Sequence, residues 1–343
     1  MERTLIVATD GQAVMRSHDD GKSWHRLNIG QELEFDDCVR CLLVDPARPQ
    51  AIFAGTERGL FHSEDCGARW ARVDCALNDY AIWKLAVSES NPEVMYAGTG
   101  SPTRSICFRS RDGGRNWERT ALEMPERCAG VSRPRMLALA VDPYDPNDVM
   151  AGVEEGGLFR SRDGGDSWER IDTTAWTERA GNSDIHDIVI LPGTPKVTLA
   201  LTVLSLYRST DDSKSWAYMG ARDSWGLRYS RCLLRKPGSN MELALGIGDG
   251  TPGTTASILR SSDAGASWAH MSLSTPANSC VWAFGANAAD PDFLLAGTKF
   301  GNLYRSADGG TTWEKEWREF SEITDLAWVP GVPENQDLPH VTN

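Results

Sequence analysis

The chain has 343 residues, of which 24% are charged and 41% are hydrophobic, and its formal net charge is -13 at pH 7. This acidic balance argues against nucleic acid or an anionic membrane as a partner, because both require a basic footprint. No apolar stretch reaches 18 residues, so the sequence predicts no membrane-spanning helix.

The chain begins with two apolar runs, 5–9 and 13–16, followed by a motif that reads Ser-x-Asp-x-Gly-x-x-Trp at 17–24. Because the first run follows almost directly on Met1, we expect no removable signal peptide and a cytosolic protein. Copies or close variants of the motif occupy 17–24, 63–70, 110–117, 161–168, 209–216, 261–268 and 306–313. Self-similarity at a period of about 50 residues predicts a repeat architecture.

Two further apolar runs precede each later motif, as at 42–44 and 51–55, 137–141 and 149–153, and then along the rest of the chain. Runs this short, bounded by Gly, Pro, Asp and Asn, are typical of strands. With the run before the motif and the run that its Trp opens, each period holds four strands, which is one antiparallel propeller blade.

The motif itself predicts the turn between the third and fourth strands. Asp accepts backbone hydrogen bonds in such turns, and Gly adopts the positive φ that a Cβ would penalise. The Trp then opens the fourth strand and is expected to pack against the neighbouring blade. Ser213 replaces Gly in the fifth copy and Cys66 lies in an irregular second copy, so we expect these two turns to be less ideal.

The last apolar run, 323–330, has the pattern of a first strand with no blade after it, whereas the chain opens without a first strand. Pairing the two would complete a seventh blade and remove the exposed sheet edges. The prediction is therefore an all-β protein: one seven-bladed propeller over residues 1–330, followed by a tail at 331–343.

The repeats resemble the Asp-box, or bacterial neuraminidase, repeat, and the resemblance covers nearly the whole chain. Propellers with this repeat include sialidases, xyloglucanases, sortilin-type receptors and photosystem II assembly factors. In them the box lies on the face opposite the active site. The resemblance therefore implies that the motif aspartates are structural: Asp19, Asp112, Asp163, Asp263 and Asp308.

A comparison of the blades with one another singles out one position near the start of each first strand. It holds Arg40, Trp83, Leu137, His186, Arg231, Trp282 and Thr324, and the position two residues earlier holds Cys38, Ala81, Arg135, Asp184, Tyr229, Cys280 and Glu322. By the period of two, both sets are expected to point the same way, into the axial mouth of the propeller. A purely structural ring would repeat one small or apolar residue type.

These residue types predict an anion-binding pocket over the axis. The expected substrate-binding residues are Arg40, Arg135, Arg231, Trp83, Trp282 and Lys84, and the expected catalytic residues are His186, Asp184, Glu322 and Tyr229. Arginine suits bidentate recognition of a carboxylate, and a histidine beside a carboxylate suits proton transfer. The alternative is that the arginines pair with nearby acidic residues in a purely structural network, with Asp36, Asp37, Asp184, Asp187 and Glu322 as the partners.

The predicted function is a cytosolic enzyme that acts on an anionic small molecule, an aromatic or sugar-like acid, by hydrolysis or by lyase-type elimination. The rival prediction is a non-catalytic scaffold that docks a protein partner on the same arginine-rich face. A sialidase-like site has the right inventory in Arg40, Arg135, Arg231, Tyr229 and Glu322, but its order and local motif do not match. Xyloglucanase-like hydrolysis needs two aspartates in separate blades, for which Asp184 with Asp325 or Asp37 are nominal candidates.

No cofactor is expected. A divalent metal held by His186, Asp184 and Glu322 is the lesser alternative, because these residues come from distant parts of the chain. The eight cysteines, among them Cys38 and Cys41 in a C-x-x-C spacing, show no disulfide framework and are expected to be reduced.

Overall fold

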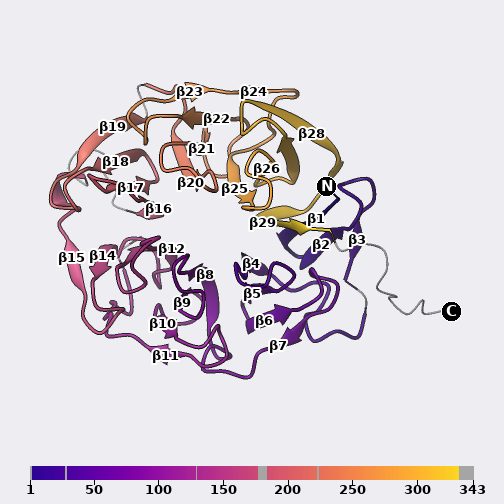
Figure 1. Ribbon diagram of the computed structural model, residues 1–343, viewed down its shortest axis with the longest axis horizontal. Coiled ribbons are helices and arrows are strands. Elements are labelled where there is room, and N and C mark those ends of the chain that lie inside the picture. The colour runs from indigo at the N-terminus through magenta and orange to yellow at the C-terminus, as the bar shows by residue number, and fades with distance from the viewer. Residues whose placement is uncertain (1, 28, 129, 177–183, 222–223, 332–343) are drawn as a thin grey trace.

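The computed structural model describes residues 2–27, 29–128, 130–176, 184–221 and 224–331. Its strands form seven sheets arranged in a ring around an axis (Figure 1), which confirms the predicted all-β, seven-bladed propeller. Within each sheet the neighbouring strands of a blade are antiparallel, and one strand per blade lies nearest the axis.

The first four blades have these strands. Blade 1 is β29 (Glu322–Pro330), β1 (Arg3–Asp10), β2 (Val14–Ser17) and β3 (His25–Arg26); blade 2 is β4 (Val39–Val44), β5 (Ile52–Thr56), β6 (Gly59–Ser63) and β7 (Ala71–Arg72). Blade 3 is β8 (Ala81–Val87), β9 (Met95–Gly100), β10 (Cys107–Ser110) and β11 (Glu118–Arg119); blade 4 is β12 (Met136–Val141), β13 (Val149–Val153), β14 (Gly157–Ser161) and β15 (Glu169–Ile171).

The last three blades complete the ring. Blade 5 is β16 (Ile185–Leu191), β17 (Val197–Thr202), β18 (Ser205–Ser209) and β19 (Ala217–Ala221); blade 6 is β20 (Tyr229–Arg235), β21 (Leu243–Gly248), β22 (Ala256–Ser261) and β23 (Ala269–His270). Blade 7 is β25 (Val281–Ala286), β26 (Leu294–Thr298), β27 (Asn302–Ser306) and β28 (Thr312–Glu319), with β24 (Ser272–Leu273) as a fifth strand parallel to β28.

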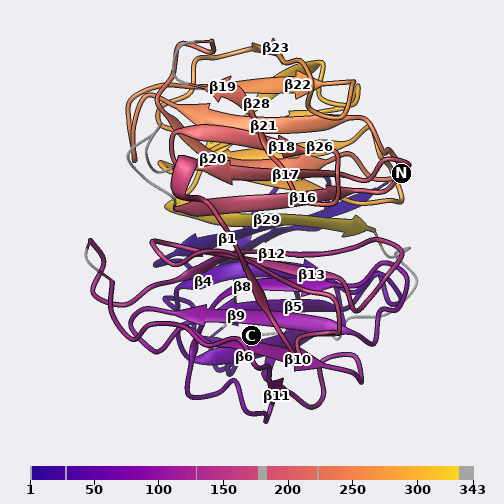
Figure 2. The ribbon, with the colours of Figure 1, turned by 90° about the vertical axis from the view of Figure 1, so that its left-hand side faces the viewer.

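Strands from both ends of the chain share blade 1. β1 pairs antiparallel with β29, in a register that runs from Arg3 opposite Pro330 to Asp10 opposite Glu322, and Figures 1 and 2 both show β29 beside β1. Of the predicted tail, only Gly331 is among the described residues, and its N–H donates to the Glu2 carbonyl at 2.7 Å. The rest of that tail lies outside the described residues.

All seven motif turns have the same hydrogen bonds. In the first, Ser17 Oγ donates to Asp19 Oδ1 at 2.8 Å, the Gly21 N–H donates to Ser17 Oγ at 2.8 Å, and the Ser23 N–H donates to Asp19 Oδ1 at 2.9 Å. The equivalent three bonds recur in the other six turns. The structural role predicted for the motif aspartates is therefore confirmed, and the two irregular copies keep the same turn.

Side chains of the motif regions join neighbouring blades, through a Trp in all seven regions and an Arg in five of them. The motif Trp packs onto the preceding blade, as Trp24 does on Phe293 and Leu295 of blade 7, and each of the seven core clusters contains one such Trp. The Arg before the motif Ser points the other way: Arg16 Nε donates to the Cys66 carbonyl of blade 2 at 2.8 Å. Equivalent bonds to the next blade's turn are made by Arg109, Arg160, Arg208 and Arg305.

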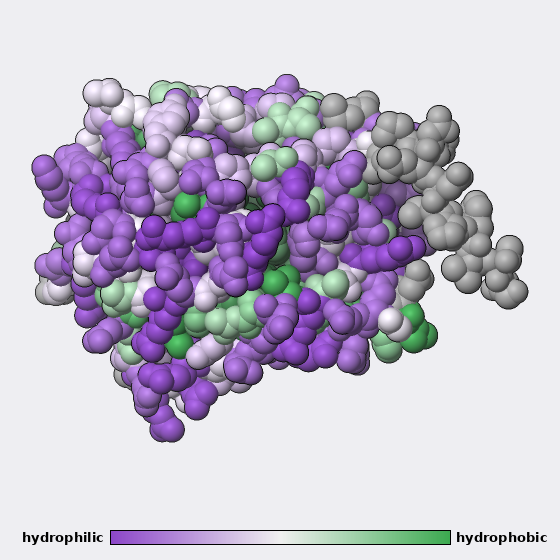
Figure 3. Space-filling model, turned by 60° about the horizontal axis from the view of Figure 1, so that its bottom comes forward, coloured by the Kyte–Doolittle hydropathy of each residue, from purple (hydrophilic) through white to green (hydrophobic). Residues whose placement is uncertain are grey.

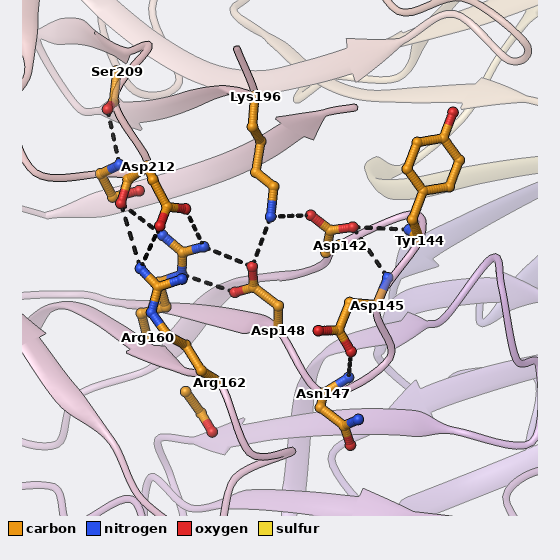
Figure 4. Close-up of polar contacts among 12 residues, drawn as sticks. Asp142, Tyr144, Asp145, Asn147, Asp148, Arg160, Arg162, Lys196, Ser209 and Asp212 are labelled. Carbon is orange, nitrogen blue, oxygen red and sulfur yellow. Dashed lines mark hydrogen bonds and ion pairs between the residues drawn. The ribbon is translucent and has the colours of Figure 1, made fainter. Parts of the chain in front are cut away.

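The most buried of these inter-blade contacts joins blades 4 and 5 (Figure 4). Arg160 is 1% exposed, and its guanidinium lies 2.6 Å from a carboxylate oxygen of Asp148 and 2.7 Å from one of Asp212. Lys196 places its ammonium 2.5 Å from Asp142 and 2.8 Å from Asp148. Five charged side chains thus form one network across this interface, and it connects the two sheets.

One face of the propeller is drawn in Figure 3, and it is predominantly hydrophilic. On this face, hydrophobic side chains form only small, scattered groups. Among the described residues, no helix is long and apolar enough to cross a membrane. The eight cysteines form no disulfide.

Candidate functional site

Each strand that lines the axis contains one extra residue, at the same position in every blade. In blade 2, Val39 pairs with Thr56 and Cys41 with Gly55, so that Arg40 between them has no partner. The same one-residue slip occurs in the other six blades. The residues left unpaired are those that the comparison of blades singled out: Arg40, Trp83, Leu137, His186, Arg231, Trp282 and Thr324. A β-bulge re-aims a side chain, and here seven bulges aim seven side chains at the axis.

These seven side chains line a single cavity of about 90 Å³. The residues that follow several of the bulges, Lys84, Asp187 and Asp325 among them, line it too. Pockets that enclose a drug-sized ligand have volumes of roughly 300–1,000 Å³, whereas one water needs roughly 10–15 Å³. The cavity therefore has room for a small group and some water, and not for a whole sugar ring.

Each of the two aspartates that line the cavity connects its own axial strand to a neighbouring one through a hydrogen bond. Asp187 accepts the Leu233 N–H of blade 6 at 2.8 Å, and Asp325 accepts the Leu42 N–H of blade 2 at 2.8 Å. Lys84 lies 3.9 Å from Asp187, whose charge raises the pKa of the lysine. Burial raises the pKa of Asp325 to about 6, against the opposing effect of Lys84.

On one side of the mouth, Trp83 lies between cations that have carboxylate partners. The guanidinium carbons of Arg40 and Arg135 lie 4.5 Å and 4.9 Å from its ring centre, and its indole N–H donates to the Ser101 carbonyl at 2.7 Å. Arg40 pairs with Glu57 and Arg135 pairs with Glu154. Both arginines thus have a carboxylate partner, but neither Glu57 nor Glu154 is among the acidic residues that the sequence suggested.

On the other side, Trp282 has a cation without such a partner. Arg231 lies 4.2 Å from the ring centre of Trp282, and among the described residues it has no carboxylate within ion-pair distance. Lys299 also lies over this ring, at 4.5 Å, and its ammonium is 2.6 Å from Glu322. The Tyr229 ring is nearly parallel to Trp282, with centres 6.4 Å apart. The positive charge of Arg231 is therefore available to a ligand.

His186 is buried beside the same arginine. Its Nδ1 lies 2.7 Å from the Ser230 carbonyl oxygen, which requires Nδ1 to carry the proton and leaves Nε2 as an acceptor. Burial, and then the charge of Arg231, lower the pKa of His186 to about 3. The carbonyl of Ser230, rather than the expected carboxylate of Asp184, fixes this tautomer, since Asp184 accepts the Glu155 N–H at 2.7 Å. His186 is thus a neutral hydrogen-bonding group near neutral pH.

The bulge residues and the residues two positions earlier were expected to share one face of the strand, but the bulge places them on different faces. All seven bulge residues line the cavity, whereas none of the residues two positions earlier does so. Of the expected catalytic residues, only His186 lines it; Tyr229 contacts the His186 ring at 5.4 Å, and burial raises the pKa of Tyr229. Glu322 lies near Trp282 through Lys299, and its side chain is 44% exposed. The catalytic assignments stay predictions.

Asp187 and Asp325 line the axial cavity, although neither was among the site residues predicted from the sequence. The signal was present, because each directly follows a bulge residue, His186 and Thr324 respectively. Among the described residues, no group of three or more His, Cys, Asp or Glu side chains is placed to hold a metal ion.

Comparison with curated proteins finds similarity to polysaccharide-degrading enzymes. The chain is 28% identical over 324 residues to a xyloglucanase from Paenibacillus sp, with 78% of this chain and 31% of that protein covered. It is 25% identical over 379 residues to a xyloglucanase from Hypocrea jecorina, with 95% and 43% covered. The chain thus spans less than half the length of these relatives, and no family model matches it.

Solved structures share the fold. The GH74 xyloglucanase from Xanthomonas campestris superposes with a TM-score of 0.62 at 23% identity, covering 81% of this chain and 45% of that one. YCF48 from Cyanidioschyzon merolae superposes with a TM-score of 0.57 at 18% identity, covering 86% and 88%. At these identities the likeness shows the seven-bladed architecture alone.

Proposed function

We propose that this propeller is a glycosidase-like hydrolase whose substrate is a sugar carrying an anionic group, bound over the axial mouth. The observation that carries the proposal is Arg231, whose guanidinium lines the axial cavity with no carboxylate partner among the described residues. Arginine recognises carboxylates and phosphates through paired, directed N–H groups. The similarity to xyloglucanases supports hydrolysis as the reaction. A cytosolic location belongs to the same proposal.

The size of the cavity sets how such a ligand binds. A volume of about 90 Å³ admits the anionic group and excludes the sugar ring, so the ring stays at the mouth, beside Tyr229 and Trp282. There the exposed carboxylate of Glu322 is within reach of a ligand, and Lys299 holds it in place. In this arrangement Glu322 accepts a proton from the water that attacks the anomeric carbon and gives it to the leaving-group oxygen as the glycosidic C–O bond breaks. His186 offers Nε2 as a hydrogen-bond acceptor, and Arg231 binds the anionic group.

The test is the release of reducing ends from three sets of oligosaccharides: neutral xyloglucan fragments, fragments containing uronic acids, and sialylated fragments. We expect the wild type to cleave an anionic set. Glu322→Gln should lose roughly a hundredfold or more in rate, since a positioned acid–base group contributes about 10²–10⁴-fold. Lys214→Ala, which removes an exposed cation on the opposite face, should retain full activity.

Cleavage of neutral xyloglucan fragments alone would contradict the anionic substrate and leave a xyloglucanase-like hydrolase. If no set is cleaved by the wild type, the hydrolase itself is contradicted.

The second candidate is a docking scaffold, and the small cavity favours it. A space of about 90 Å³ is far below the usual size of a small-molecule pocket, whereas a peptide carboxylate can approach Arg231 from outside. One YCF48 structure of the same fold, with a TM-score of 0.51 and 14% identity, is described as bound to D1 peptide. Fluorescence polarisation with acidic peptides bearing a free or an amidated C-terminus separates the two functions: a scaffold binds the free acid while no sugar binds.

A further inference from the structure

We infer that binding of the anionic group in the axial cavity is coupled to protonation of Asp325, so that this site takes up a proton as it fills. The inference rests on the proposed function, because it concerns the same ligand in the same cavity. It rests on which charged groups face Asp325 in the cavity, and on how few of them can change their protonation state when the anion binds.

Each of the seven strands around the axis contributes side chains to the cavity lining. The charged and titratable side chains that line it are Arg40 and Cys41 from β4, Lys84 from β8, His186 and Asp187 from β16, Arg231 and Cys232 from β20, and Asp325 from β29. β12 contributes Leu137, and β25 contributes Trp282, Ala283 and Phe284. Arg40 is neutralised by Glu57 outside the lining. Two cations, Lys84 and Arg231, therefore face two carboxylates.

An anion that enters this space is drawn to Arg231 and Lys84, and it is repelled by both aspartates. With a volume of about 90 Å³, the cavity cannot keep the anion far from either carboxylate. A like charge at close range favours the neutral form of a carboxyl group. One of the two aspartates is therefore expected to take up a proton when the anion arrives.

Asp325 is the carboxylate that responds, because Asp187 is the better compensated of the two. Asp187 has Lys84 at 3.9 Å in addition to the N–H groups of Leu233 and Ile188. Among the described residues, the partners of Asp325 are two backbone N–H groups, those of Leu42 at 2.8 Å and Leu326 at 2.9 Å. Burial already raises the pKa of Asp325 to about 6, so a further rise brings it into the range of neutral pH.

Binding of the anion is expected to weaken as the pH rises above 6. Below pH 6 Asp325 is already protonated in the free protein, so the dissociation constant stays flat. Above pH 6 binding requires proton uptake, and the dissociation constant rises by up to about tenfold per pH unit until the pKa of the complex is passed. A rise of one unit in that pKa on binding predicts roughly fivefold weaker binding at pH 8 than at pH 6.

The experiment is titration calorimetry of glucuronate, whose own carboxylate stays ionised from pH 5.5 to 8. Measuring the heat at pH 7 in two buffers of different ionisation enthalpy gives the number of protons taken up by the wild type, without any substitution. We expect an uptake of about 0.4 proton at pH 7, together with the fivefold weakening at pH 8. Asp325→Asn should abolish the uptake and bind at pH 8 as the wild type does at pH 6. Asp36→Asn, on an exposed loop, should behave as the wild type.

The outcomes separate this inference from the proposed function. Binding with no proton uptake and no pH dependence would overturn the coupling and leave the anion site standing. Uptake that persists in Asp325→Asn would assign the proton to another group and overturn it as well. If glucuronate does not bind between pH 5.5 and 8, the anionic sugar ligand fails and the coupling fails with it.

Discussion

The two tryptophans at the axial mouth have different electrostatic surroundings. The arginines over Trp83 are ion-paired with Glu57 and Glu154, whereas Arg231 over Trp282 has no carboxylate partner among the described residues. Surface and half-buried ion pairs contribute little net attraction for a third charge, because their fields largely cancel. Under the proposed function, a ligand's negative charge is therefore held on the Trp282 side, so the mouth is electrostatically asymmetric although the blades repeat.

The fifth motif turn holds a strained residue that glycine should relieve. Ser213 has a φ of 66°, and its buried hydroxyl has no hydrogen-bond partner within the part of the chain that the structure describes. A left-handed conformation penalises a residue with a Cβ by about 1–2 kcal/mol. We expect Ser213→Gly to raise the free energy of unfolding by about 1 kcal/mol, measured by chemical denaturation. Ser213→Ala removes only the hydroxyl, so a glycine variant no more stable than the alanine variant would show that the turn is unstrained.

For individual residues, the sequence singled out the positions that form the bulges but not the groups that their side chains contact. A comparison of repeats identifies any position whose residue type breaks the pattern, which is how Arg231 and His186 were found. Their charge environment depends on distances between blades, and no periodicity encodes those. The pairing of Arg135 with Glu154, and the N–H groups that Asp325 accepts, therefore became visible only in the structure.

The blades are held in the ring by contacts that run backward from all seven motifs and forward from five of them. The Trp packs backward on the preceding blade, and the Arg before the motif bonds forward to a turn carbonyl of the next one. The strand pattern and the turn chemistry were predictable because they are local. The forward bond was not, because its acceptor is a backbone carbonyl about 50 residues further along the chain.

Arg160 makes the most buried of the forward contacts, and its removal should destabilise the propeller strongly. Arg160→Ala leaves Asp148 and Asp212 without their guanidinium, and breaking a buried ion pair in this way destabilises a protein by about 3–5 kcal/mol. Chemical denaturation measures the loss. Arg111, which is 57% exposed and lies 3.6 Å from Glu118, is the matched control: its alanine variant should lose at most about 1 kcal/mol. Equal losses for the two would contradict the structural role of burial.

The same network predicts sensitivity to acid. Burial alone would raise the pKa of Asp148, but the hydrogen bonds from Arg160 and Lys196 outweigh it, so the pKa lies below its usual value. A carboxyl with a depressed folded-state pKa stabilises the protein above its unfolded value of about 3.9, and this stability is lost as the pH falls below it. The wild type should therefore lose more stability than Arg160→Ala between pH 5 and pH 3, as followed by thermal unfolding. Parallel losses in the two proteins would argue against the network.

For the whole molecule, the pairing of β1 with β29 joins strands from opposite ends of the chain in one blade. Trp328 of β29 is fully buried against Phe293, with ring centres 5.4 Å apart. Trp328→Ala should destabilise the propeller by about 3–5 kcal/mol, the usual loss for a buried tryptophan. Trp317→Ala, at a residue 65% exposed on β28, should change stability by less than about 1 kcal/mol. Similar losses for both variants would contradict the place of β29 in the ring.

One binding event is central to the proposed function, namely that Arg231 holds an anionic sugar over the axis. The most direct test is calorimetric titration of glucuronate and of glucose at pH 6 into the wild type, Arg231→Ala and Lys214→Ala. We predict that glucuronate binds, that glucose does not, and that binding is lost in Arg231→Ala but kept in Lys214→Ala. Equal binding of both sugars, or glucuronate binding that survives in Arg231→Ala, would contradict the account.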